Sequence, residues 1–118
     1  PPLLMERNHL SEVLVNILHN ARDAVGGKGT IRVQTRFGEN FAVIIGISDD
    51  GPGMTPENVA KIFEPYFTTK AKGTGLGLAI VKHNTEIYGG TVSVESELGK
   101  GTRFTIRLPA KTFMRIRK

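Results

Sequence analysis

Two asparagines, one carboxylate and a run of glycines are the residues of this sequence whose types and spacing suggest chemistry. Asn16 and Asn20 stand four residues apart, Asp49 closes an apolar segment, and Gly73, Gly75 and Gly77 alternate with other residues. Amide and carboxylate oxygens can hold a cation or accept from an amine. Glycine-rich backbone ahead of a helix can bind phosphate. Each signal is weak alone, so its meaning depends on the elements that position it.

The first asparagines fall in a segment with helical periodicity. Apolar residues from Asn8 to Val25 recur at i, i+3, i+4 and i+7, and Gly26 follows as a stop signal. Asn16 and Asn20 form a polar ridge on the shoulder of the apolar stripe, joined by Asp23. The residues alone leave two interpretations open: the ridge is either a solvated helix edge or the wall of a cleft. Asparagine is a poor helix former, so two of them in mid-helix carry a cost in helix propensity.

Asp49 ends a predicted strand, 41–48, on its apolar face. Strict alternation places Val43, Ile45 and Ile47 on the same side as Asp49. A carboxylate on an apolar face needs a partner, because burying it alone is unfavourable. The glycines that follow, Gly51 and Gly53, permit close approach of the backbone. This combination suits an amine-bearing heterocycle such as adenine, whereas the alternative is a turn-forming Asp that faces water.

The last predicted strand, 102–108, repeats this pattern. Thr102 shares a face with Phe104, Ile106 and Leu108, so its hydroxyl points toward the core. The hydroxyl could bridge to Asp49 directly or through a water. The alternative is a β-branched residue that is simply favoured in strands.

The glycine run precedes a second predicted helix, 76–88. The unpaired N–H groups of a helix start favour an anion, and Lys70 and Lys72 add positive charge nearby. The pattern is neither the G-x-x-x-x-G-K-[ST] loop nor G-x-G-x-x-G after a strand. Because residues 63–74 lack periodicity and read as a loop, the run suits a movable lid over phosphates.

Composition excludes several classes of protein. The chain of 118 residues has the length of one domain, no cysteine, and no apolar run of the roughly 20 residues that a membrane helix needs. Its net charge of +5 owes much to four basic residues among the last eight, and no basic stretch is interleaved with aromatics. We therefore expect no nucleic-acid partner and no membrane contact. The start at Pro1 without a Met suggests a piece of something longer.

The order of elements predicts an α+β fold. A helix, a hairpin, a short helix beginning after Thr55, a loop, a helix and a second hairpin follow one another. We predict a two-layer α/β sandwich, with helices on one face of a mixed, mainly antiparallel sheet. The predicted strands are 31–37, 41–48, 91–96 and 102–108.

These pieces, in this order, resemble the ATP-binding catalytic domain of sensor histidine kinases, in the Bergerat-fold superfamily shared with gyrase B, heat-shock chaperone and mismatch-repair ATPases. The resemblance covers roughly residues 6–109 and looks closest to kinases of the nitrogen-regulation type. It rests on "LVNILHNARDA" (14–24, the N box), "DDGPGM" (49–54, the first glycine box), "IFEPYFTTK" (62–70, the F box), "GTGLGLAIVK" (73–82, the second glycine box) and "GKGTRF" (99–104).

The resemblance implies a role for each matching residue. Asn20 would coordinate Mg²⁺, with Asn16 in the phosphate and metal region, and Asp49 would take the adenine amino group with support from Thr102. Phe63 and Phe67 would pack the lid against the domain, and Asp23 has no clear counterpart. The residues expected to bind ATP are Asn20, Asp49, Gly51, Gly53, Lys70, Gly73, Thr74, Gly75, Leu76, Gly77, Leu78 and Thr102; those expected to act in catalysis are Asn16, Asn20 and Lys70.

One position separates a kinase from a hydrolase within that superfamily. Its ATP hydrolases carry a Glu four residues before the metal-binding Asn, whereas this sequence has Asn16, which cannot accept a proton at neutral pH. The resemblance therefore favours transfer of the ATP γ-phosphate to histidine, with an ATP hydrolase or conformational clamp as the alternative. A module that binds no nucleotide is a third possibility.

The acceptor side of the reaction is missing from the sequence. His9, His19 and His83 do not match the acceptor motif of these kinases, and the strand that usually precedes the first helix is cut to "PPLLM". We therefore expect one catalytic domain over residues 1–118, with its core at 6–109 and a basic tail at 110–118. It would be cytoplasmic, would need a separate helical-hairpin dimerisation and acceptor domain, and would serve a response regulator through the full-length kinase.

Overall fold

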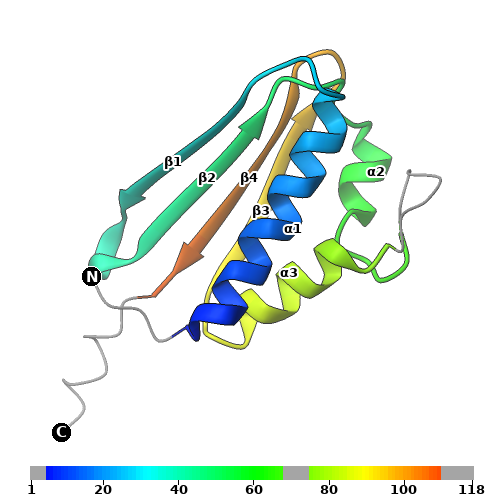
Figure 1. Cartoon of the computed structure of the whole chain (residues 1–118). Helices are drawn as coiled ribbons and strands as arrows, with labels where there is room; N and C mark the ends of the chain where they lie inside the picture. The colour runs from blue at the N-terminus through cyan, green and yellow to red at the C-terminus, as the bar shows by residue number, and fades with distance from the viewer. Residues whose placement is uncertain (1–4, 68–74, 110–118) are drawn as a thin grey trace, which may run out of the picture.

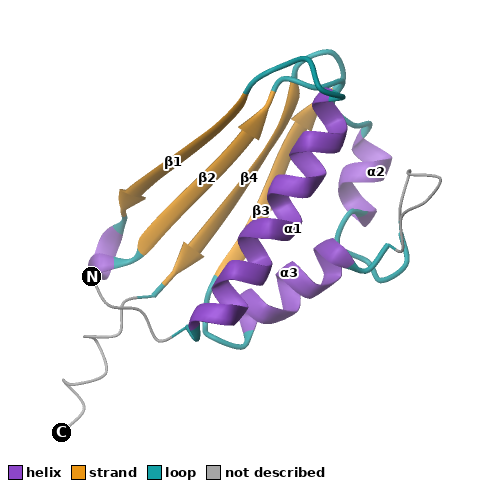
Figure 2. Ribbon diagram, in the orientation of Figure 1, coloured by secondary structure: helices purple, strands orange, loops and turns teal. Residues whose placement is uncertain are grey.

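Helices form one layer and a sheet forms the other in the computed structural model, which describes residues 5–67 and 75–109 (Figure 1). Figure 2 shows the same two layers by type of element. In chain order the elements are α1 (Arg7–Val25), β1 (Ile31–Phe37), the 3₁₀ turn η1 (Glu39–Phe41), β2 (Val43–Asp49), α2 (Pro56–Lys61), α3 (Gly77–Glu86), β3 (Thr91–Glu97) and β4 (Gly101–Leu108).

The sheet has the strand order β1-β2-β4-β3. Every pairing among the described residues is antiparallel, so β2 and β4 lie side by side at the centre although 51 other residues separate them in the chain. The predicted α+β two-layer sandwich is confirmed. The "mixed" character that we expected of the sheet does not occur within the described residues.

The core lies between the sheet and helices α1 and α3. Alternate residues of β2 and β4 point toward the helices, and the apolar stripe of α1 packs against them, as the periodicities of the sequence predict. The buried apolar residues are Met5, Val13, Ile17, Ala21, Ala42, Ile45, Ile47, Val81, Phe104, Ile106 and Leu108.

Helix ends follow the expected capping chemistry. The Glu6 carboxylate accepts from the backbone N–H groups at the start of α1, and Gly26 ends that helix in the left-handed conformation. Thr55 caps α2 by accepting from the N–H of Asn58, with Pro56 at the first helical position, as predicted.

Two boundaries differ from the prediction. The second strand begins at Val43 rather than Phe41, because Asn40 and Phe41 both adopt left-handed backbone in η1 and the Gly38 N–H closes the turn onto the Ala42 carbonyl at 2.8 Å. Helix α3 ends at Glu86, two residues before Tyr88, where turns lead to Gly89 at φ +80°.

The face of the sheet away from the helices is polar. It carries Arg32 and Arg36 on β1 and Arg103 and Arg107 on β4, which the register sets in two rows across β2. β1 is an edge strand among the described residues, and even on its helix-facing side Val33 and Phe37 stay 53% and 69% exposed. In the parts of the chain that the structure describes, no helix has the length and apolar character needed to cross a membrane.

We expect Gly101→Ala to lower the free energy of unfolding by roughly 3–5 kcal/mol, because a backbone clash adds to left-handed strain. Gly101 lies at φ +106°, and a Cβ there would come within 2.0 Å of the Asp49 carbonyl oxygen. Gly99→Ala is the matched control, at φ +82° with no atom within 4 Å of its Cβ position. Gly99→Ala should lower the free energy of unfolding by about 1 kcal/mol, which is the cost of left-handed strain without a clash. Urea unfolding of both variants tests this; equal losses would contradict it.

Candidate functional site

A row of three polar side chains crosses the end of the sheet beneath the helices. Asp49 on β2 pairs with Thr102 on β4, which pairs with Ser96 on β3. Asp49 and Thr102 are each only 7% exposed, so their position on the apolar face of their strands agrees with the sequence prediction.

The Asp49 carboxylate is held by backbone donors. It accepts from the Gly51 N–H at 2.9 Å and from the N–H of Thr102. Burial nevertheless raises the pKa of Asp49 above its ordinary value of 3.8, because desolvation outweighs these two hydrogen bonds and the neighbouring Asp50 adds to the rise. The two backbone hydrogen bonds do not offset the loss of solvation, so a hydrogen-bond donor on a ligand would stabilise this carboxylate further.

The partner of the Thr102 hydroxyl is Ser96 rather than Asp49, so the direct bridge that the sequence left possible is not the contact seen here. The hydroxyl lies 2.8 Å from the Ser96 Oγ, and the link to Asp49 comes from the Thr102 backbone. The Ser96 hydroxyl also accepts from the Met54 N–H and donates to the Gly101 carbonyl, so Ser96 is the centre of this network. We did not predict Ser96, although Val92, Val94 and Ser96 alternate on one face, the same signal that identified Asp49.

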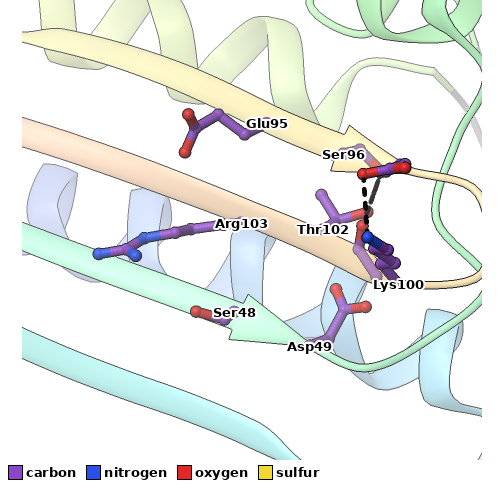
Figure 3. Close-up of a pocket in the computed structure, with 9 residues that line it drawn as sticks. Ser48, Asp49, Glu95, Ser96, Lys100, Thr102 and Arg103 are labelled. Atoms are coloured by element: carbon purple, nitrogen blue, oxygen red, sulfur yellow. Dashed lines mark hydrogen bonds and ion pairs between the residues drawn. The ribbon is translucent and has the colours of Figure 1, made fainter.

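A hollow of about 350 Å³ opens at this end of the sheet (Figure 3). Residues that alternate between the two faces of the strands contribute to its lining. The lining residues are Ser48, Asp49, Glu95, Ser96, Glu97, Lys100, Gly101, Thr102 and Arg103.

One ridge of α1 connects the two glycine segments. The Asn16 side chain reaches Gly77, where an added Cβ would lie 3.2 Å from Asn16 Oδ1, and two turns later Ala24 packs on Gly51, where a Cβ would lie 2.8 Å from the Ala24 carbonyl. Asn20 lies midway on that ridge, which spans about 12 Å. Asn16 and Ala24 of the N box thus lie against Gly77 and Gly51, one described residue from each glycine box.

Glu12 lies one turn before Asn16 and has a partner of its own. Its Oε1 accepts from the amide Nδ2 of Asn84 at 2.9 Å, and Asn84 is buried between α1 and α3. The carboxylate of Glu12 therefore ties the two helices together.

No side chain among the described residues caps the start of α3. Leu76, the N-cap residue, makes no side-chain cap bond and no acidic residue lies in the first turn, so this end keeps the positive potential of a helix N-terminus. The preceding Gly75, at φ +77°, accepts at its carbonyl from the Tyr66 N–H at 2.7 Å. This bond joins the end of the F box to the second glycine box.

The aromatic residues of the F box differ in their contacts. Phe63 packs edge-on against the core residue Phe104, with ring centroids 6.1 Å apart, as the resemblance implied. Phe67 is half-buried. Leu78 packs against the core from α3.

Gly51 and Gly53 allow a close approach, but to the protein itself. A Cβ at Gly53 would lie 2.1 Å from the Glu97 carbonyl, and the Gly99 N–H donates to the Pro52 carbonyl at 2.8 Å. The first glycine box is therefore packed onto the turn between β3 and β4.

Several predicted residues cannot be placed. Lys70, Gly73 and Thr74, with Lys72 and the basic tail 110–118, lie outside the described residues. Asp23, whose role the sequence left open, is exposed with its Oδ1 3.8 Å from the Nε of Arg22.

Comparisons with known proteins bear on the family and the fold of the chain. Residues 5–112 match the family described as histidine kinase-, DNA gyrase B- and HSP90-like ATPases. Over 102 residues the chain is 48% identical to the sensor histidine kinase ZraS of Salmonella typhimurium, covering 86% of this chain and 22% of that protein. The chain thus spans about a fifth of the length of this relative.

Solved structures of histidine kinases share the fold. The mycobacterial sensor histidine kinase MprB superposes with a TM-score of 0.83 at 29% identity, covering 91% of this chain and 76% of that one. Full-length ShkA, solved in complex with AMPPNP, gives a TM-score of 0.76 at 34% identity over 86% of this chain and 21% of that one.

We expect Asp49→Asn to leave the domain at least as stable as the wild type at neutral pH. Because the folded pKa of Asp49 is raised, the ionised carboxylate weakens the folded state above that pKa, and this penalty disappears as the pH falls through it. The advantage of the variant should therefore shrink toward acid pH. Urea unfolding of both proteins across the pH range measures it. A wild-type advantage at neutral pH that is lost on acidification would show a lowered pKa instead.

Proposed function

Because the chain belongs to the family of histidine kinase-, DNA gyrase B- and HSP90-like ATPases, we propose that it is the ATP–Mg²⁺-binding catalytic domain of a sensor histidine kinase. It transfers the γ-phosphate of ATP to a histidine on a separate helical-hairpin dimerisation and acceptor domain. Residues 1–118 form this one domain in the cytoplasm, with the response regulator served by the full-length kinase. The subtype stays a prediction, the nitrogen-regulation type.

Adenine binding is assigned to the end of the sheet. The carboxylate oxygens of Asp49 are hydrogen-bond acceptors, and burial raises the pKa of Asp49 because its two backbone hydrogen bonds do not offset desolvation, so an N–H donor such as the adenine amino group suits this position. Asp49 is only 7% exposed, so the protein excludes most water from that contact. The relative ShkA, solved with AMPPNP, shares 34% identity with this chain and supports an adenine nucleotide as ligand.

Phosphate binding is assigned to the other end of the α1 ridge. The N–H groups at the start of α3 favour an anion, and Gly75 and Gly77 let the Tyr66 backbone and the Asn16 side chain pack closely beside this helix end. Lys70, Gly73, Thr74 and the backbone of Leu76 and Leu78 complete this part of the proposal. Lys70 would neutralise phosphate charge.

Mg²⁺ fits the donors on the ridge. Magnesium binds few protein oxygens and shares its shell with substrate phosphates, so the amide oxygens of Asn20 and Asn16 are suitable ligands. Within residues 5–67 and 75–109 no group of three His, Cys, Asp or Glu could hold a metal without such phosphates. When bound, the ion would neutralise charge on the transferring phosphoryl group.

The observation that favours kinase over hydrolase is the residue four positions before Asn20, which is Asn16 where the hydrolases of the superfamily carry a Glu. Asn16, one turn before it, cannot accept a proton, and Glu12, one turn further, is engaged by the Asn84 amide. Activation of water needs a base within hydrogen-bond reach, whereas a neutral imidazole is itself a nucleophile. A histidine acceptor can therefore react where water does not.

Phosphotransfer tests the proposal. Mixing this chain, ATP labelled at the γ-phosphate and a separately produced acceptor hairpin should give acid-labile label on the hairpin, with Asn20→Ala reducing it at least a hundredfold if Asn20 holds the metal, since positioning and charge neutralisation carry most of this reaction. Calorimetric binding of ATP without any label would contradict the kinase function. Rapid ATP hydrolysis by the isolated chain would favour the hydrolase or clamp alternative.

The substitution Glu12→Gln further distinguishes a histidine kinase from an ATP hydrolase. Because an amide can still accept from Asn84, the variant should keep its stability within about 0.5 kcal/mol, as is usual for a surface substitution. We expect label transfer to the hairpin to stay within twofold of the wild type. A loss of Mg²⁺-dependent ATP turnover in a variant that still folds would identify Glu12 as a base and contradict this assignment.

A further inference from the structure

Ser96 lies at the centre of the hydrogen-bond network beneath the candidate adenine site, and no sequence motif or family match assigns it a role. We propose that Ser96 is a positioning residue for base recognition, which holds the Thr102 hydroxyl with its lone pairs toward the ligand. This inference rests on the proposed function, because it concerns the specificity of the same site.

The three contacts of the Ser96 hydroxyl determine where its proton lies. Ser96 Oγ is 2.8 Å from the Met54 nitrogen, 2.9 Å from the Gly101 carbonyl oxygen and 2.8 Å from Thr102 Oγ1. The Met54 N–H can only donate and the carbonyl can only accept. A serine has one proton, so that proton goes to the Gly101 carbonyl.

The proton of Thr102 is then committed as well. With the Ser96 proton on the Gly101 carbonyl, the contact between the two hydroxyls forms only if Thr102 donates. The remaining lone pairs of Thr102 Oγ1 face away from Ser96. A hydroxyl that could otherwise rotate becomes a fixed acceptor.

The result is an edge that offers acceptors alone. Thr102 stands directly opposite Asp49 in the register, and the Asp49 carboxylate already acts as an acceptor toward the Gly51 N–H. Two adjacent acceptors suit a ligand with an exocyclic amino group and suit poorly a ring atom that is itself an acceptor. Figure 3 shows Asp49, Thr102 and Ser96 together at this end of the sheet.

Ser96 also fixes the loop that carries the recognition edge. Its bond to the Met54 N–H joins the first glycine box to β3, and the bond from the Gly99 N–H to the Pro52 carbonyl joins the same box to the turn between β3 and β4. Ser96 need not touch the nucleotide for these effects. Its contribution is to orient Thr102 relative to Asp49.

The experiment compares two nucleotides across three variants of this chain. ATP and purine riboside triphosphate, which lacks only the 6-amino group, are titrated calorimetrically into the wild type, Ser96→Ala and Ser96→Thr. We expect Ser96→Ala to weaken ATP binding about five- to tenfold, the size of one or two hydrogen bonds. Affinity for the analogue should change less than about twofold, and Ser96→Thr, which keeps the hydroxyl, should restore ATP binding.

Ser93→Ala is the matched control, since Ser93 lies on the same strand, is exposed and points to the opposite face. It should leave both affinities unchanged. Equal losses for ATP and the analogue in Ser96→Ala would show a merely structural role and overturn the inference, while the proposed function would stand. No binding of ATP by the wild type would overturn both.

Discussion

The antiparallel register between β2 and β4 is the constraint on which the candidate site depends. It sets Asp49 opposite Thr102 and brings the Gly101 backbone so close to the Asp49 carbonyl that no side chain fits between them. A slip of one residue would turn the carboxylate to the open face and expose the alternating core residues of both strands. The packing that stabilises the sheet is therefore the same packing that sets the direction of the recognition edge.

The two ends of the site are built by different means. At the base end, backbone N–H groups and the Ser96 network hold a carboxylate whose ionisation the buried position opposes. At the phosphate end, a single helical ridge sets Asn16 against Gly77, and the contact between Tyr66 and Gly75 is one backbone hydrogen bond. The base end is thus embedded in the sheet, whereas the phosphate end depends on the packing of helices and one loop contact.

Periodicity in the sequence predicted most of the fold, because each strand and helix buries one face. Asp49 and Thr102 were identified since a polar residue on an apolar face is visible in the sequence itself. The partner of the Thr102 hydroxyl was not, because it depends on the register of a strand that pairs across a turn. The 3₁₀ turn at Asn40 and Phe41 was also missed, since left-handed backbone at a phenylalanine has no local signal. The engagement of Glu12 by Asn84 required knowledge of how α1 packs on α3.

The edge strand β1 has a bearing on how this chain behaves in concentrated solution. Its outer backbone groups have no strand partner within residues 5–67 and 75–109, and together with the exposed Val33 and Phe37 such groups invite pairing with the edge of another molecule. Arg32 and Arg36 alternate with them, so two such edges that approach each other bring like charges together. These arginines therefore act as gatekeepers against edge-to-edge aggregation. Their repulsion weakens as salt screens it, so the colloidal stability of the domain should decline with ionic strength.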